Sequence, residues 1–153
     1  MIVDIFEIEE DIKNKKYRYI GQGSSRKVFD MRNGYVVKIA RNNAGIAQNK
    51  AEYKIYNRDD SKIFAKVLGV SEDYRYLIME KAKAIRDYNI ILEYFDVNYK
   101  GDLKSVDIIV KIMNKYSLLW GDIKKKSSWG IIGDRLVMID YGFTYNIKKQ
   151  YYQ

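Results

Sequence analysis

Two aspartates near the end of the sequence have the residue type and the setting for proton or metal chemistry. Asp122 follows a small-residue corner, and Asp140 ends an apolar run just before Tyr141-Gly142. They lie eighteen positions apart, with three lysines at 124–126 between them. A carboxylate at the end of a turn can accept a proton, and one at the end of a strand can coordinate a hard cation. Each aspartate taken alone is better explained as a turn cap.

Composition limits the chemistry that the chain can perform. It has no histidine and no cysteine, which excludes the commonest general base, disulfides and thiolate metal sites. Acid–base chemistry must therefore use Asp, Glu, Lys or Tyr, and we expect any metal to be Mg²⁺ held by carboxylates. The net charge of +8 indicates attraction to anions such as phosphates, nucleotides or nucleic acid, without choosing among them.

The apolar pattern predicts the elements that must position these residues. Strands are expected at 16–20, 28–31, 35–40, 64–70 and 74–80, and helices at 44–57, 85–97 and 103–119. Asn33-Gly34 predicts a two-residue turn between the second and third strands, and a last hairpin is expected with strands at 130–132 and 136–139 around Gly133-Asp134. Strands separated from helices in this order indicate an α+β fold.

Length and terminal composition bear on domain number and location. At 153 residues the chain is expected to form a single domain over 1–153. Its acidic first segment does not have the pattern of a secretory signal, and no apolar run approaches the ~18 residues of a membrane span. We therefore expect a cytoplasmic protein without a membrane partner.

Glycines and charges in the first half could hold a phosphate. Gly21 and Gly23 lie between two strands, where glycine lets the backbone approach a ligand and offer N–H groups to phosphate oxygens. A glycine pair between strands is more often only a turn. Lys38 lies within an apolar strand and points either to solvent or into a cleft. Glu52 on the following helix could pair with it and hold it for phosphate contact, although such pairs usually contribute little.

The order of these features resembles the protein-kinase-like fold. The glycine turn, strand lysine, helix glutamate, loop aspartate and strand-end Asp-Tyr-Gly match over about residues 20–143. The resemblance implies a five-stranded antiparallel N-lobe with one helix over about 1–80, and a reduced helical C-lobe with a β-hairpin over 81–153. In this form the chain is similar to compact kinase-like proteins of bacteria and phages with a truncated C-terminal lobe.

The resemblance also assigns roles to single residues. The residues that it implies for nucleotide binding are Gly21, Gly23, Val28, Lys38, Glu52, Met79, Glu80 and Ala82. The last three belong to the segment whose backbone would bind adenine, and Arg26 stands in place of a third glycine of the loop. Asp122 would be the catalytic aspartate, and Lys124 would neutralise charge as it develops. Asp140 would hold Mg²⁺ on the phosphates of ATP, with Ser127 at the place of a second metal ligand.

The sequence departs from the kinase pattern at three places. Ser127 replaces an asparagine, and Gly121 replaces the usual histidine or tyrosine before the catalytic aspartate. The sequence ends shortly after Gly142, so we expect no activation segment and no large lower lobe. Substrate recognition would then use the tail, the lysines at 124–126 or a partner chain, which leaves room for a homo-oligomer.

Three functional hypotheses follow. The first is an ATP- and magnesium-dependent kinase acting on Ser or Thr of a protein, itself included. The second is a catalytically silent nucleotide-binding pseudokinase or scaffold, favoured by Ser127 and the reduced lobe. The third is a nucleic-acid-binding protein, based on the +8 charge, the 15 tyrosines and the basic-aromatic tail YNIKKQYYQ.

Overall fold

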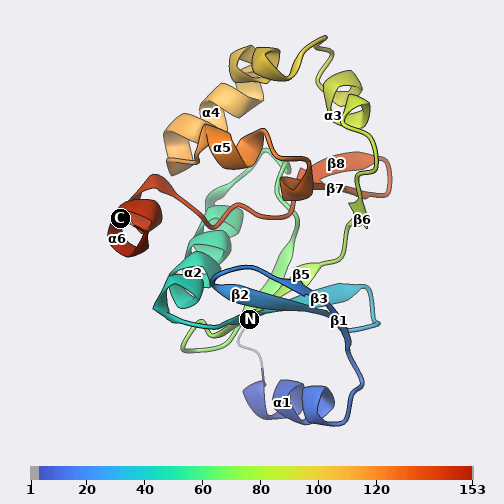
Figure 1. Cartoon of the computed structure of the whole chain (residues 1–153), viewed down its shortest axis with the longest axis vertical. Helices are drawn as coiled ribbons and strands as arrows, with labels where there is room; N and C mark the ends of the chain where they lie inside the picture. The colour runs from blue at the N-terminus through green and yellow to red at the C-terminus, as the bar shows by residue number, and fades with distance from the viewer. Residues whose placement is uncertain (1–3, 153) are drawn as a thin grey trace. The chain divides into compact units, whose positions relative to one another are not determined.

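The structure, a computed structural model, describes residues 4–152 of the chain. Its described residues form two compact units. Figure 1 colours the ribbon by residue number, so the segments of each unit can be followed along the chain. The first unit contains residues 4–58 and 65–81, and the second contains residues 59–64 and 82–152. The interpretation of residues 1–153 as a single domain divided near residue 80 stays a prediction.

The first unit is built on one antiparallel sheet. Its strands are β1 (Arg18–Gln22), β2 (Arg26–Asp30), β3 (Tyr35–Ala40), β4 (Val67–Val70) and β5 (Tyr76–Glu80). They are hydrogen-bonded in the order β1-β2-β3-β5-β4, and each neighbouring pair is antiparallel. Helix α2 (Asn43–Arg58) follows β3. These elements confirm the expected five-stranded antiparallel sheet with one helix inserted after the third strand, and with it the α+β class.

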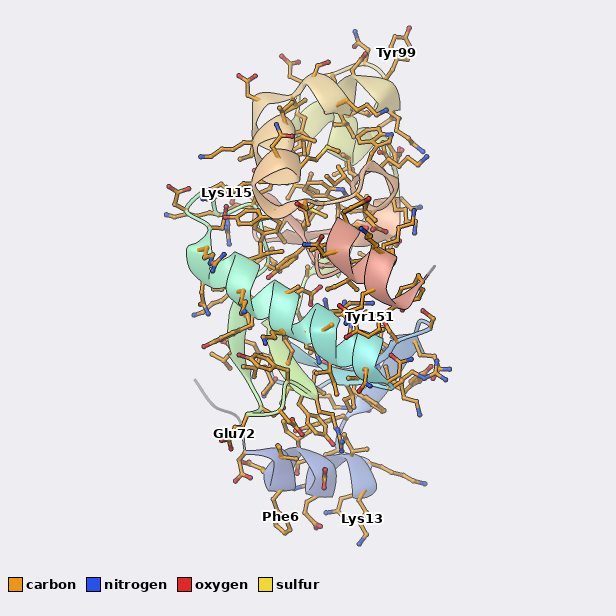
Figure 2. The ribbon with its side chains drawn as sticks, turned by 90° about the vertical axis from the view of Figure 1, so that its left-hand side faces the viewer. Phe6, Lys13, Glu72, Tyr99, Lys115 and Tyr151 are labelled. Atoms are coloured by element: carbon orange, nitrogen blue, oxygen red, sulfur yellow. The ribbon has the colours of Figure 1, made fainter. Side chains whose placement is uncertain are left out.

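Helix α1 (Ile5–Lys13) was not expected from the sequence. Asp4 caps it, because its Oδ1 accepts the N–H of Phe6 at 3.0 Å. The buried side of α1 places Ile8 against Val37 and Tyr76 of the sheet, whereas Phe6 is 73% exposed and points away from the sheet in Figure 2. The two helices therefore cover opposite faces of the sheet (Figure 1).

The turn between β2 and β3 differs from its prediction. Met31 N–H donates to the Tyr35 carbonyl at 3.0 Å, so the loop has three residues and the prediction of a two-residue turn at Asn33-Gly34 was wrong. Arg32 takes the left-handed conformation with φ 62°, and Gly34 takes it with φ 90°. Asp30 stabilises this path, since its Oδ1 accepts the Arg32 N–H at 2.8 Å. This side-chain bond favours the longer loop over the shorter turn.

The second unit combines a small sheet with short helices. Its strands β6 (Lys83–Ala84), β7 (Trp129–Ile132) and β8 (Arg135–Met138) form an antiparallel sheet in that order. Its helices are α3 (Asn89–Tyr94), α4 (Asp107–Tyr116), α5 (Trp120–Ile123) and α6 (Tyr145–Tyr151), with 3₁₀ turns η1 (Lys100–Ser105) and η2 (Lys126–Ser128). Within residues 4–152, no helix has the length and apolar character to cross a membrane.

Several predicted boundaries in this part of the chain needed correction. The hairpin around Gly133-Asp134 is confirmed, since Ile132 pairs with Arg135. The predicted helix over 85–97 is only α3, because Asp87 Oδ1 accepts the Asn89 N–H at 2.9 Å at its start and Asp96, with φ 55°, takes the left-handed conformation after its end. The helix predicted over 103–119 begins as η1 and ends at Ser117, which has φ 55°. The strand predicted over 64–70 is only β4, because Phe64 bridges Met138 in the second unit.

Buried aromatic rings organise the second unit. Trp129 is 1% exposed, and its Nε1 donates to the Ile123 carbonyl at 2.7 Å, which ties α5 to β7. Tyr141 is also buried, with its ring centroid 4.5 Å from that of Phe64. Because α5 and the segment after β8 are both fixed by these rings, the two aspartates that they carry have a rigid support.

Gly45 offers a test of how α2 packs on the first unit. A Cβ at this position would lie 2.2 Å from the Ser25 carbonyl oxygen and 3.0 Å from Ala40 Cα. We expect Gly45→Ala to destabilise the protein by about 1–3 kcal/mol, because backbone must move to admit the methyl group. Urea unfolding followed by circular dichroism measures this. Gly101→Ala is the control, since nothing lies within 4 Å of its Cβ; equal stability of the two variants would contradict the packing.

Candidate functional site

The sheet of the first unit aligns several predicted nucleotide-binding residues. Gly21 pairs with Val28, and Val28 pairs with Lys38, so the three lie side by side across β1, β2 and β3. Directly paired residues of antiparallel strands point to the same face. Met79 pairs with Val36, two residues before Lys38, and therefore shares that face. The face is the one that α2 covers, because Lys38 reaches a side chain of α2.

Gly21 and Gly23 are not required as glycines by the structure of the loop. A Cβ built on either residue meets nothing within 4 Å, and neither has a positive φ. The loop is instead held from outside, since Gly23 N–H donates to the Arg26 carbonyl at 2.9 Å and Arg41 Nη1 donates to the Gly23 carbonyl at 2.6 Å. A role only in turn geometry therefore does not explain these two glycines, and the space around them is open to a ligand.

Lys38 forms a buried ion pair with Glu52. Its Nζ lies 3.0 Å from Oε1 and 3.2 Å from Oε2 of the carboxylate. Glu52 is 0% exposed and Lys38 only 6%. The choice between solvent and the protein interior, which the sequence left open, is thus decided in favour of the interior. A lysine held in this way has its ammonium group fixed on one face of the sheet.

Arg26 is the residue of this site that the sequence analysis missed. Its Nη1 and Nη2 reach the two oxygens of Glu52 at 2.7 and 3.1 Å, and Nη1 also donates to Asn49 Oδ1 at 3.0 Å. Strand periodicity was the signal that could have found it, because Arg26 lies two residues before Val28 and so shares the face of Lys38. Glu52 therefore has two cationic partners where the kinase pattern implies one.

The two cations keep Glu52 ionised. Burial raises the pKa of the Glu52 carboxyl, but the charges of Arg26 and Lys38 lower it by more than burial raises it. The resulting pKa is about 2. The buried charge is therefore compensated by two neighbours at hydrogen-bond distance.

The predicted adenine-binding residues are divided between the two units. Glu80 ends β5, and its N–H donates to the Lys66 carbonyl at 2.8 Å. Ala82 belongs to the second unit and lies beside Gly130, where an added Cβ would be 2.6 Å from the Ala82 Cβ. The adenine role of Met79, Glu80 and Ala82 stays a prediction.

Asp122 on α5 has an unusual environment. Its side chain is 22% exposed, and Oδ1 accepts Lys125 Nζ at 3.4 Å. Its Oδ2 is buried and has no hydrogen-bond partner within residues 4–152. Burial raises the pKa of the Asp122 carboxyl; the charge of Lys125 opposes this rise and that of Asp140 adds to it. The structure thus brings together the two aspartates that the sequence singled out.

Asp140 and the lysines at 124–126 lie in different surroundings. Asp140 is exposed directly after the buried β8. The ammonium group that pairs with Asp122 belongs to Lys125 and not to Lys124, whose carbonyl accepts the Tyr88 hydroxyl at 2.8 Å. Ser127 is exposed in η2. The metal role of Ser127 and the charge-neutralising role of Lys124 stay predictions.

The carboxylates near Asp140 bear on whether the expected magnesium ion could bind there. No group of three or more carboxylates occurs within the described part of the chain. Mg²⁺ commonly takes one or two protein carboxylates and completes its shell with substrate phosphates and water. The exposed Asp140 carboxylate with Asp122 nearby fits that mode of binding, with phosphates supplying the other ligands.

Comparison with known proteins identifies the fold. No protein-family model and no curated protein sequence matches the chain. Among solved structures, it is similar to the aminoglycoside phosphotransferase APH(2″)-IIa in ternary complex with streptomycin and ATP, with TM-score 0.54 and 19% identity over 93% of this chain and 72% of that one. The gentamicin complex gives TM-score 0.53 and 19% identity over 93% and 71%. The fold is protein-kinase-like.

The protein-kinase-like fold confirms the resemblance drawn from the order of the sequence motifs. The first unit of this chain contains the five-stranded sheet, α2 and the glycine turn. The second unit contains Asp122 and Asp140. At 19% identity the comparison establishes the architecture and leaves the chemistry to be argued from the residues.

Removal of the Glu52 charge is expected to be strongly destabilising. Glu52→Gln should cost ~3–5 kcal/mol of unfolding free energy at pH 7, because Arg26 and Lys38 would remain buried without the charge of Glu52. Since the folded pKa is lowered from 4.5 to about 2, this stabilisation is present above pH 4.5 and is lost as the pH falls toward 2. Denaturant unfolding over this pH range measures the effect. Glu72→Gln, an exposed position labelled in Figure 2, is the control; a similar small change in both variants would refute the role of Glu52.

Asp122 should show the opposite pH dependence. Because its folded pKa is raised, the wild-type protein loses stability as the pH rises through the carboxyl titration. We expect Asp122→Asn to gain on the order of 1 kcal/mol at pH 7, and the gain to shrink as the pH is lowered toward about 4. Thermal unfolding of both proteins at several pH values checks this. A variant that is less stable at pH 7 would show that the Asp122 charge is stabilised in the fold.

Proposed function

We propose that the protein is an ATP- and magnesium-dependent phosphotransferase that transfers the γ-phosphoryl group to a hydroxyl. The observation that carries this proposal is the buried Oδ2 of Asp122, without a hydrogen-bond partner within the described residues and with Asp140 nearby. An unsatisfied buried carboxylate oxygen costs stability, so folds retain one mainly where a reaction uses it.

The first unit supports nucleotide binding. Lys38 is held by Glu52 on the same face of the sheet as Gly21 and Val28. A fixed ammonium group and an open glycine turn are the features that phosphate oxygens require. The ATP in the ternary complex of APH(2″)-IIa supports the choice of this nucleotide.

Asp122 has the properties of the group that receives the proton. In the proposed step, the acceptor O–H donates to the Asp122 carboxylate, whose side chain is 22% exposed, and gives up its proton there. The acceptor oxygen forms a bond to the γ-phosphorus of ATP, the bond from that phosphorus to the β–γ bridging oxygen breaks, and ADP leaves. A carboxyl pKa raised by burial makes Asp122 a better proton acceptor than an exposed aspartate.

Asp140 is the proposed magnesium ligand. Its carboxylate is exposed and lies near Asp122, and Mg²⁺ bound there would neutralise charge on the transferred phosphate. Lys125 pairs with Asp122 Oδ1 at 3.4 Å and so orients the carboxylate. Lys124 and Ser127 are proposed only as secondary contributors, to charge neutralisation and to a second metal.

A small-molecule hydroxyl is the acceptor that we favour. The solved structures similar to this chain hold streptomycin or gentamicin, which are small molecules. The Ser/Thr protein kinase hypothesis, with autophosphorylation, is the alternative acceptor class. The silent pseudokinase has one observation in its favour, because Arg26 shares Glu52 with Lys38 and so competes for the carboxylate that holds the phosphate-binding lysine.

Two assays on matched variants test the proposal. Calorimetric titration of ATP should show magnesium-dependent binding that Asp140→Ala removes and Asp122→Asn keeps. Transfer of radiolabelled γ-phosphate to pooled small alcohols, and separately to lysate proteins, should fall about 10²–10⁴-fold in Asp122→Asn, because the proton acceptor is lost.

Asp134→Asn, in the exposed hairpin turn, is the control and should behave as the wild type does. Magnesium-independent ATP binding without transfer would establish the pseudokinase instead. Transfer confined to lysate proteins or to the chain itself would establish the protein kinase.

A further inference from the structure

Four lysines of the second unit gather around one open pocket of about 520 Å³. It is lined by Tyr88, Lys100, Lys124, Lys125, Lys126 and Ser127. A volume of this order is typical of sites for small molecules. None of the described residues that line it is acidic, so the pocket carries a concentrated positive charge.

The walls of the pocket are held by contacts within the unit. The Tyr88 hydroxyl donates to the Lys124 carbonyl at 2.8 Å, which fixes the backbone after α5. Lys100 Nζ lies 4.4 Å from the centre of the Tyr88 ring, a cation–π distance. Lys126 Nζ donates to the Arg86 carbonyl at 3.2 Å. The positions of these charges are thus set by specific partners and not only by solvent.

Most of the positive charge in the pocket has no carboxylate partner. Lys125 pairs with Asp122, but within residues 4–152 no carboxylate oxygen forms a salt bridge with Lys100, Lys124 or Lys126. Like charges so close together repel one another and favour binding of an anion. Lys126 and Lys100 keep donor capacity beyond their present contacts, because an ammonium group has three hydrogens.

The pocket also adjoins the group that receives the proton in the proposed reaction. Lys125 lines the pocket, and its Nζ lies 3.4 Å from Asp122 Oδ1. Lys125 thus links the pocket lining to Asp122, and an anion bound beside Lys125 would bring a hydroxyl of the same small molecule toward that carboxylate.

We propose that this pocket binds the phosphate group of the acceptor, and that the acceptor is a small phosphate monoester with a free hydroxyl. The proposal rests on the phosphotransferase function and names its substrate class. Lys100, Lys124 and Lys126 bind the phosphate, and the hydroxyl is presented to Asp122. An aminoglycoside, which carries several ammonium groups, is repelled by the same lysines, so the ligands of the similar solved structures are not the substrates of this chain.

Binding is tested first, in the absence of ATP, so that it does not depend on catalysis. Inorganic phosphate, ribose 5-phosphate and glucose 6-phosphate are titrated by calorimetry at low salt, beside ribose, glucose and gentamicin. We expect the phosphates to bind and the other three not to bind. Lys100→Gln and Lys126→Gln should each weaken phosphate binding about tenfold, since a charge-assisted hydrogen bond is lost, and added salt should weaken it further.

Lys115→Gln is the matched control, because Lys115 lies on α4, outside the pocket lining, and is labelled in Figure 2. Circular dichroism establishes that each variant is folded. Equal phosphate affinity in the pocket variants and the control, or binding of gentamicin in place of phosphate, would overturn the proposal. A single-stranded RNA oligonucleotide that binds the pocket far more tightly than any monoester would also overturn it, in favour of nucleic acid.

Transfer separates this proposal from the proposed function. Label from ATP appearing on the bound ester, and lost with Lys126→Gln at unchanged ATP affinity, supports the acceptor assignment. Label on other hydroxyl compounds but never on phosphate esters overturns the assignment and leaves the phosphotransferase intact. Absence of transfer to any compound, with ATP and esters both bound, refutes the phosphotransferase function and with it the acceptor role.

Discussion

The buried carboxylate of Glu52 is the constraint on which the first unit depends. It receives Arg26 from β2 and Lys38 from β3, so one side chain of α2 holds two strands. Asn49, one turn earlier on α2, extends the network by donating to the Tyr74 carbonyl at 2.9 Å. Such a network is stable only when every member is satisfied, because removal of one buried charge leaves the others uncompensated. The face of the sheet that aligns Gly21, Val28 and Lys38 is therefore also its most polar buried region.

The Asp122 carboxylate of the second unit differs from Glu52 in its hydrogen bonding. Asp122 keeps one buried oxygen that has no hydrogen-bond partner among residues 4–152, and the unit is held by apolar and aromatic packing around Trp129 and Tyr141. A satisfied buried carboxylate serves architecture, and an unsatisfied one is held ready for a ligand or a proton. In a chain without histidine or cysteine, Asp122 is the group that we propose as the proton acceptor.

The acceptor proposed for this protein differs in charge from the ligands of the solved structures that share its fold. The solved structures that share its protein-kinase-like fold hold cationic aminoglycosides, whereas the pocket beside Asp122 is lined with lysines and lacks an acid. Electrostatic complementarity acts through a few side chains on loops, which change without altering the scaffold. The net charge of +8 thus becomes informative only when its location is known.

The sequence by itself determined the local structure and the order of the site residues. Strand β3, helix α2 and the last hairpin follow from periodicity and turn residues, and the order of charged motifs indicated the kinase-like fold. Only the tertiary structure decided which charges meet: Arg26 joins Lys38 on Glu52, and Lys125 reaches Asp122. It also decided the extent of α3, which is shorter than the helical spacing predicts. Periodicity and turn preference act over a few neighbouring residues, whereas these partners are set by strand register and packing between segments distant in the chain.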